Sequence, residues 1–173
     1  NYDLLNQATT LCAIEILQKE RGFCISNEAI NKGITKLPNC RMEQIPFPLI
    51  PKSSKSNLIY LDVAHNEEGL EALLRSLMFK HPEKKIEVVY AVAFTKDIYS
   101  CIEVLFEYCS KVSFTTSYHP KLANICQIKD SVSNFASENN LNGFEINFFE
   151  NLHEAINSTI DKTTNESLVL ITG

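Results

Sequence analysis

The sequence predicts an α/β protein, a three-layer fold in which a mainly parallel, twisted sheet of about six strands carries helices on both faces. Apolar runs of strand length alternate with segments whose apolar residues recur at helical spacing. A parallel pair of strands needs a long crossover, and a helix supplies it. The chain has 173 residues, 45% hydrophobic and 21% charged, which suits one domain with a full core.

Two helices and an edge strand are expected before this alternation begins. Apolar residues at helical spacing predict an amphipathic helix over 4–20. Ser26 is a good N-cap for a second, shorter helix that ends near Gly33. The segment 41–50 alternates and is interrupted by prolines, so it predicts an edge strand that leads into a polar connection over 51–57.

The remaining elements follow in regular order along the chain. Strands are expected over 57–62, 86–92, 112–116, 144–149 and 168–172. Helices are expected over about 67–80, 97–109, 121–139 and 150–162.

Charge and cysteine content narrow the class of protein. The net charge is −5 with no basic block, so we expect neither a nucleic-acid surface nor an anionic-membrane surface. No apolar run is long enough to span a bilayer, and the first residues do not form a signal peptide. The six cysteines lack CxxC pairs, which favours a reducing, cytoplasmic location. Because the chain starts without methionine and stops after an apolar run, we expect a piece of a longer polypeptide.

The stretch "LDVAHNEEG" places an aspartate, a histidine and an asparagine where a predicted strand ends and a helix begins. One interpretation is structural: Asn66 or His65 caps the helix, and Asp62 turns the chain. The other is functional: Asp62 accepts hydrogen bonds from ribose hydroxyls, and the other two lie near phosphates at the positive helix end. Local physics leaves both open. No HxxxH or cysteine pair lies nearby, so no metal site is expected.

Two more stretches carry polar residues next to predicted strands. "LPNCRMEQI" sets Arg41 at the entrance to a strand, as a surface residue or as a planar group for a base or phosphate. "VAFTKDI" sets Lys96 and Asp97 after a strand, where Thr95 or Asp97 caps a helix or Lys96 neutralises an anionic ligand. The motifs GxxxxGK[ST], GxGxxG and GxSxG are missing from the sequence.

Five stretches in this order resemble one family: "LLNQATTLCAIEIL", "LPNCRMEQI", "IYLDVAHNEEGL", "VAFTKDI" and "LVLITG". They resemble the C-terminal domain of the folylpolyglutamate synthase/dihydrofolate synthase group of the Mur ligase superfamily. That pattern runs N-x-x-x-A, PGR-[FM]-E, D-[GV]-AHNP, a DKD-type turn and [TC]GS. The resemblance implies a Rossmann-like fold, with 1–20 as linker and first helix at the domain junction and 21–173 as the glutamate ligase domain.

The resemblance also implies roles for single residues in binding ATP. Asn6 looks like the family asparagine that contacts the adenine, and Arg41 like the arginine of PGR, a second nucleotide contact. Asp62 is similar to the aspartate that binds the ribose. His65 and Asn66 match the residues that follow it, near the phosphates and the incoming amino acid.

The implied activity is the addition of L-glutamate to dihydropteroate or (poly)glutamylated tetrahydrofolate in folate biosynthesis. ATP converts the acceptor carboxylate to an acyl phosphate, which the amine of glutamate attacks, and Mg²⁺ neutralises the phosphoryl group. Lys96 corresponds to the lysine of the DKD turn, so Lys96 and His65 are expected near glutamate. The phosphate loop and magnesium ligands belong to an N-terminal ATPase domain, so this chain, expected as a monomer, should be inactive alone.

The sequence departs from the family pattern at four places, and one of them is that the chain stops before the serine of [TC]GS. Cys40 stands for the glycine of PGR, Glu67 stands for the proline of AHNP, and "FTKD" lacks the first aspartate of DKD. A Mur-type cell-wall ligase domain with the same fold is one alternative. The other is a non-enzymatic flavodoxin-like or receiver-like interaction module, in which Asp62 and Lys96 would be phosphoacceptor residues or caps.

Overall fold

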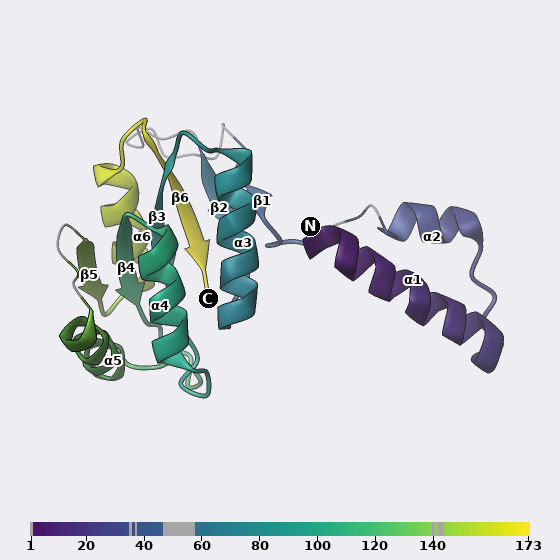
Figure 1. The fold of residues 1–173 in the computed structure, drawn as a ribbon, viewed down its shortest axis with the longest axis horizontal. Helices are drawn as coiled ribbons and strands as arrows, with labels where there is room; N and C mark the ends of the chain where they lie inside the picture. Colours follow the sequence, from purple (N-terminus) through teal and green to yellow (C-terminus); the bar gives the residue numbers. More distant parts are fainter. Residues whose placement is uncertain (1, 35, 37, 47–57, 140, 142–143) are drawn as a thin grey trace. The chain divides into compact units, whose positions relative to one another are not determined.

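The computed structural model describes residues 2–34, 36, 38–46, 58–139, 141 and 144–173. The chain divides into two compact units, Asn1–Asn39 and Cys40–Gly173. The smaller unit contains the two predicted helices, α1 (Tyr2–Arg21) and α2 (Asn27–Ile34) (Figure 1). Ser26 caps α2 as expected, because its Oγ accepts from the Ala29 amide at 3.1 Å.

Within the described residues, the larger unit contains a six-stranded sheet in the order β1-β2-β6-β3-β4-β5. Its strands are β1 (Glu43–Gln44), β2 (Ile59–Leu61), β3 (Lys85–Tyr90), β4 (Lys111–Thr115), β5 (Glu145–Phe149) and β6 (Ser167–Thr172). Its helices are α3 (Glu67–Lys80), α4 (Ile98–Tyr108), α5 (Ile125–Glu138) and α6 (Leu152–Lys162). β1 pairs with β2 in antiparallel fashion and the other pairs are parallel, which confirms the predicted mainly parallel sheet.

Two elements differ in extent from the sequence prediction by more than the others do. The helix expected from residue 121 begins only at Ile125, because Asn124 heads a capping box that starts it there. The edge strand expected over 41–50 is short, and its predicted continuation over 47–50 lies outside the described residues. The predicted polar connection over 51–57 also lies outside them.

The direction of the crossovers decides which helix covers which face. The chain moves one way through β2, β3, β4 and β5 and then reverses to insert β6 between β2 and β3. Since parallel crossovers are right-handed, this reversal puts α6 on the face opposite to α3, α4 and α5 (Figure 1). The sheet is therefore covered on both faces, as predicted.

The two faces of the sheet are unequal in polarity. Alternate residues of β3, such as Val88 and Tyr90, point into the main apolar core, to which α3, α4 and α5 also contribute. The α6 face has a smaller apolar cluster of Ile59, Ile160 and Val169. Alternate side chains of β3 therefore point into a large apolar core on one face and into a smaller apolar cluster with polar side chains on the other.

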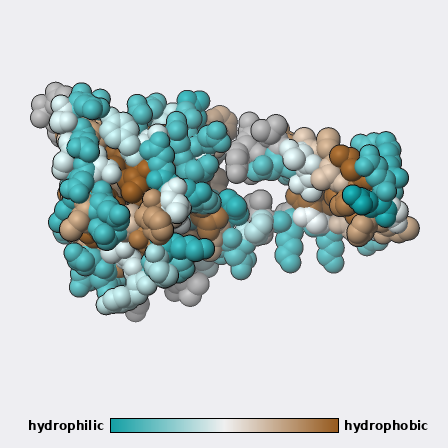
Figure 2. All heavy atoms as spheres, turned by 90° about the horizontal axis from the view of Figure 1, so that it is seen from below, coloured by the Kyte–Doolittle hydropathy of each residue, from teal (hydrophilic) through white to brown (hydrophobic). Residues whose placement is uncertain are grey.

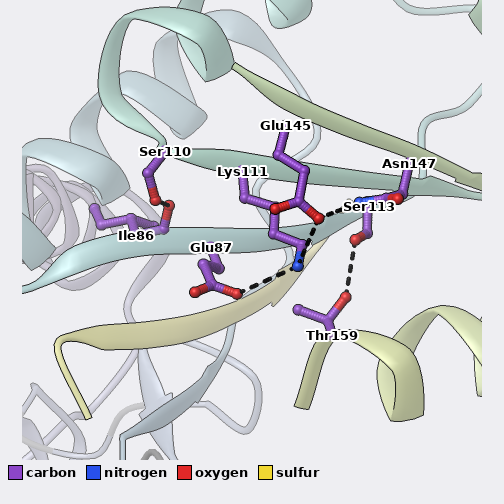
Figure 3. Close-up of polar contacts among 8 residues, drawn as sticks. All are labelled: Ile86, Glu87, Ser110, Lys111, Ser113, Glu145, Asn147 and Thr159. Carbon is purple, nitrogen blue, oxygen red and sulfur yellow. Dashed lines mark hydrogen bonds and ion pairs between the residues drawn. The ribbon is translucent and has the colours of Figure 1, made fainter. Parts of the chain in front are cut away.

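At the amino ends of β3, β4 and β5, the α6 face carries an ion cluster of Glu87, Lys111 and Glu145, called the amino-end cluster below (Figure 3). Lys111 pairs in register with both glutamates. Its Nζ lies 3.0 Å from Glu145 Oε1 and 3.9 Å from Glu87 Oε2. Beside it, Thr159 Oγ1 of α6 donates to Ser113 Oγ at 2.8 Å, so polar side chains fasten α6 to the sheet.

Candidate functional site

The carboxyl ends of β2 and β6 meet at one edge of the sheet, where polar loops follow both strands. β2 is followed by Asp62 and β6 by Gly173. The Asp62 amide donates to the carbonyl of Ile171 at 3.1 Å. Thr172 Oγ1 donates to the carbonyl of Ala64 at 3.0 Å in a buried bond. The loop after β2 is therefore held against the end of β6.

Gly173 lies against the backbone that leaves β3. Its φ is +127°, and a Cβ at this position would lie 1.7 Å from the carbonyl oxygen of Ala91. Only glycine accepts both the conformation and the close approach. This explains why the family pattern has a glycine after the last strand.

Asp62 uses both carboxylate oxygens to organise the backbone around it. Oδ1 accepts from the Ala64 amide at 2.8 Å, and Oδ2 accepts from the Met42 amide at 2.7 Å. A carboxylate has about four acceptor sites, so a half-buried Asp62 keeps acceptor capacity for a ligand hydroxyl. The structural and functional interpretations of Asp62 are therefore compatible.

Arg41 stands in a tight turn immediately beside Asp62. The residues before and after it have left-handed backbones, with φ of 55° at Cys40 and 47° at Met42. The Met42 side chain packs against the main core, whereas the Arg41 side chain is exposed. Cys40 thus adopts the conformation that the glycine of the family pattern would favour. The structure brings Arg41 and Asp62 to the same edge.

The start of α3 contains His65, Asn66 and the first helical residue, Glu67. Asn66 occupies the N-cap position, but its side chain makes no cap hydrogen bond. A Cβ at Gly69 would lie 2.7 Å from Asn66 Oδ1, so the amide lies over the first turn. His65 Nδ1 lies 2.8 Å from the Val63 carbonyl, which requires the proton on Nδ1.

Lys96 and Asp97 follow β3. The sequence predicted a helix cap and a cation for an anionic ligand in this loop. Asp97 caps α4, because its carboxylate accepts from Ser100 N at 3.1 Å and Ser100 Oγ at 2.8 Å. The Ser100 backbone amide, more than its hydroxyl, holds the pKa of Asp97 below its usual range. Lys96 is half-buried in a turn closed by its amide and the Ala93 carbonyl at 3.0 Å. The charge of Lys96 is therefore not used in capping.

The sequence analysis missed the loop after β4, which lies beside the Lys96 loop. The Phe94 amide donates to the Lys121 carbonyl at 3.0 Å, and the Ala123 amide donates to the Val92 carbonyl at 2.8 Å. Lys121 is exposed and adds a second cation to this edge. The signal available in the sequence was "HPKLAN", a polar stretch directly after a predicted strand.

The thiol of Cys101, in α4, is buried. Burial raises the pKa of Cys101, and the charges of Asp97, Glu67 and Lys96 also act on it, each more weakly. The Tyr90 hydroxyl is buried next to the Cys101 thiol, and burial raises the pKa of Tyr90.

Asn6 belongs to the smaller unit, Asn1–Asn39. There its side chain is exposed on α1, and its carbonyl accepts from Thr10 Oγ1 at 2.8 Å. In the described parts of the chain, no three His, Cys, Asp or Glu side chains cluster as metal ligands. No described helix has the length and hydropathy needed to cross a membrane.

Comparison with known proteins gives a family match over most of the chain. Residues 41–173 match the family described as "Mur ligase, glutamate ligase domain". A Bacillus subtilis (strain 168) protein described as dihydrofolate synthase/folylpolyglutamate synthase is 30% identical over 118 residues. That alignment covers 67% of this chain and 25% of the relative, so the chain spans about a quarter of that protein's length.

Solved structures share the fold over almost the whole chain. E. coli FolC in complex with DHPP and ADP superposes with a TM-score of 0.72 at 21% identity, over 97% of this chain and 35% of that chain. A Yersinia pestis folylpolyglutamate synthase/dihydrofolate synthase complexed with AMPPNP and Mn ion has a TM-score of 0.65 at 20% identity, over 87% of this chain and 32% of that chain. These likenesses confirm the predicted fold class.

Proposed function

The chain belongs to the Mur ligase glutamate ligase domain family, and we propose that it is the C-terminal domain of an ATP-dependent folate–glutamate ligase. The whole protein would attach L-glutamate to dihydropteroate, to (poly)glutamylated tetrahydrofolate, or to both. One observation carries the proposal: the Met42 amide binds Asp62 and so brings the Arg41 turn to the end of β2. The relative described as dihydrofolate synthase/folylpolyglutamate synthase supports this substrate class.

We assign the nucleotide to the surface formed by the Arg41 turn, Asp62 and the start of α3. Asp62 would accept from ribose hydroxyls with the acceptor sites that the backbone leaves free. Arg41 would reach a phosphate or stack on the base. His65 and Asn66 would lie near the phosphates, at a helix end whose amides no side chain caps. Asn6 would contact the adenine, as the family resemblance implies.

Glutamate would bind on the neighbouring side of the same edge, at Lys96 and His65. A dicarboxylate ligand needs cations, and the carboxylate of Asp97 is already used in capping α4. Lys121 lies on the loop that pairs with the Lys96 loop, so we add it to the glutamate side. Glu67 at the start of α3 would orient the amine of glutamate through its charge.

The chemistry explains why such a domain consists of positioning residues. A carboxylate is a poor electrophile until ATP supplies a phosphate leaving group, after which the amine of glutamate can attack it. This chain would hold nucleotide and amino acid in line and exclude water. We propose that the Mg²⁺ ligands belong mainly to the N-terminal ATPase domain, as the family resemblance implies.

The smaller unit supports the proposal of an N-terminal partner domain in the same polypeptide. Figure 2 shows apolar side chains on the surface of α1, where Leu4, Leu11 and Ile16 are exposed. A two-helix unit cannot bury such a face by itself. We propose that α1 forms the domain junction and that the ligase domain begins near residue 40, where the units divide and the family match begins.

The six unpaired cysteines support a cytoplasmic location for the enzyme, which we propose to be a monomer.

Nucleotide binding by the full-length protein that contains this chain tests the proposal. Arg41→Ala should weaken ATP binding in calorimetry by about tenfold or more, because one charge-assisted contact to phosphate is lost. Arg75→Ala is the control, since Arg75 is an exposed arginine on α3 that pairs with Glu71. Equal affinity in wild type and Arg41→Ala would contradict the proposed site.

Ligase assays with radiolabelled glutamate test the substrate class and the division of labour. The full-length protein should use dihydropteroate or tetrahydrofolate as the acceptor. Turnover with muramyl-peptide acceptors alone would instead assign it to cell-wall synthesis. The 173-residue chain should show no turnover, and activity of this chain alone would contradict the assignment of the phosphate loop to another domain.

A further inference from the structure

The turn that presents Arg41 is unusual because two residues with a Cβ adopt left-handed backbones around it. Cys40 has φ of 55° and Met42 has φ of 47°. Such conformations are unfavourable for residues other than glycine and persist where surrounding bonds hold them. The bonds that hold this turn therefore determine the backbone position of Arg41.

Two carboxylates bind the amides on either side of Arg41. Asp62 Oδ2 accepts from the Met42 amide at 2.7 Å, and Glu43 Oε2 accepts from the Cys40 amide at 2.7 Å. Asp62 accepts from the Ala64 and Met42 amides, and the Cys40 amide donates to Glu43 instead. The bond at Cys40 therefore depends on Glu43.

Glu43 is itself held next to Asp62. It lies in β1, where it pairs with Leu61, the residue before Asp62. The Met42 side chain packs against the main core. The turn is therefore fastened to the sheet on one side by Asp62 and closed on the other by Glu43.

We propose that Glu43 is a positioning residue for nucleotide binding, because its carboxylate keeps the Cys40 amide, and with it the Arg41 turn, in the binding conformation. The inference rests on the proposed function of Arg41. Glu43 touches no substrate in this scheme and acts through the backbone. Asp62 then has two roles, since it orders the turn and offers acceptors to the ribose.

Amide hydrogen exchange measured by NMR on this chain tests the hydrogen bond between the Cys40 amide and the Glu43 carboxylate directly. Glu43→Ala should accelerate exchange of the Cys40 amide by about tenfold or more, because a hydrogen bond to a charged acceptor is lost. Glu43→Gln should keep most of the protection, since its amide oxygen can accept the same bond. Unchanged exchange at Cys40 in Glu43→Ala would overturn the proposal.

Nucleotide affinity in the full-length protein tests the consequence. Glu43→Ala should weaken ATP binding several-fold, up to about tenfold, and raise KM for ATP with a smaller change in kcat. The double variant Cys40→Gly/Glu43→Ala should regain most of the affinity, because glycine adopts this φ without strain. A surface charge without a positioning role predicts no rescue by glycine, and that result would overturn the proposal.

The two measurements separate this proposal from the proposed function. If Glu43→Ala frees the Cys40 amide and leaves the wild-type affinity for ATP unchanged, the positioning role is wrong while nucleotide binding stands. If the wild-type protein binds no nucleotide, the proposed function is wrong, and with it the role of Glu43 in binding.

Discussion

The two ends of the parallel sheet use their charged residues differently. At the amino end, Lys111 lies between Glu87 and Glu145, and its side chain is 8% exposed. At the carboxyl end, the Arg41 side chain is exposed and Asp62 is half-buried. The amino-end charges are paired with one another, whereas the Arg41 side chain is exposed and Asp62 accepts from backbone amides.

This difference shows which polar clusters qualify as candidate sites. In the amino-end cluster the ion pairs join neighbouring strands, so the charges are used in the fold. At the carboxyl end, hydrogen bonds to the backbone orient Asp62 without using up its acceptors. A cluster of charges alone therefore does not indicate binding; unused hydrogen-bonding capacity on an ordered backbone does.

The largest effect is expected at the amino end. Lys111→Met should lower the free energy of unfolding by roughly 3–5 kcal/mol, because it leaves buried Glu87 without a countercharge. Urea denaturation of this chain measures the change. Lys85→Met, at an exposed lysine that begins β3, is the control and should cost under about 0.5 kcal/mol.

A double variant shows whether the loss of stability in Lys111→Met comes from the missing countercharge or from lost packing. Adding Glu87→Met to Lys111→Met should recover most of the loss, because no unpaired charge then remains. A loss below about 1 kcal/mol for Lys111→Met would show that the amino-end cluster does not hold the strands.

At the carboxyl end, Asp62→Asn should lower the free energy of unfolding by about 1–3 kcal/mol. Asparagine has one acceptor oxygen, so either the Met42 or the Ala64 amide would face a donor. Asp97→Asn is the matched control, because asparagine is as good an N-cap as aspartate. Equal stability of the two variants in denaturation would mean that Asp62 does not order the turn.

A smaller effect of opposite sign is expected at the left-handed turn. Cys40→Gly should raise the free energy of unfolding by about 0.5–1 kcal/mol, because glycine removes the strain of a positive φ. Gly22→Ala, at a φ of +67°, should lower it by about 1 kcal/mol. Thermal unfolding of both variants checks the pair, and a less stable Cys40→Gly would show that the turn is unstrained.

The smallest expected effect is the dependence of stability on pH. The Lys111 hydrogen bond, and less strongly that from Asn147, hold the pKa of Glu145 below its ordinary value of 4.5. This stabilisation is therefore present above about pH 4.5 and lost as the pH falls through the lower folded-state pKa. Because the side chain is 56% exposed, we expect only a few tenths of a kcal/mol. Denaturation curves of wild type and Glu145→Gln should converge in acid, and a constant difference would contradict this.

Local patterns in the sequence predicted most of the fold. The α3 bounds agree with the prediction, since its four buried leucines repeat at helical spacing. Asp97 was one of two predicted caps for α4, and capping depends on residues three apart. The stretches with Asp62 and Lys96 were predicted to follow strands, and ligands bind beyond the carboxyl ends of parallel strands.

Other features depend on contacts between residues far apart in the sequence. The bond between Met42 and Asp62 joins residues 20 positions apart. The pairing of Ala93 with Leu122 puts Lys121 next to the Lys96 loop, and no periodicity predicts that register. The amino-end cluster likewise depends on the alignment of three strands.

The sequence by itself determined the order of strands and helices, the helix caps and the residue types at each strand end, because these follow from side-chain spacing and local hydrogen bonding. Only the tertiary structure decided which charges pair with one another and which remain available. The strand register that buries Lys111 between two glutamates, and the turn that sets Arg41 beside Asp62, arise from chain segments that meet only in the folded protein.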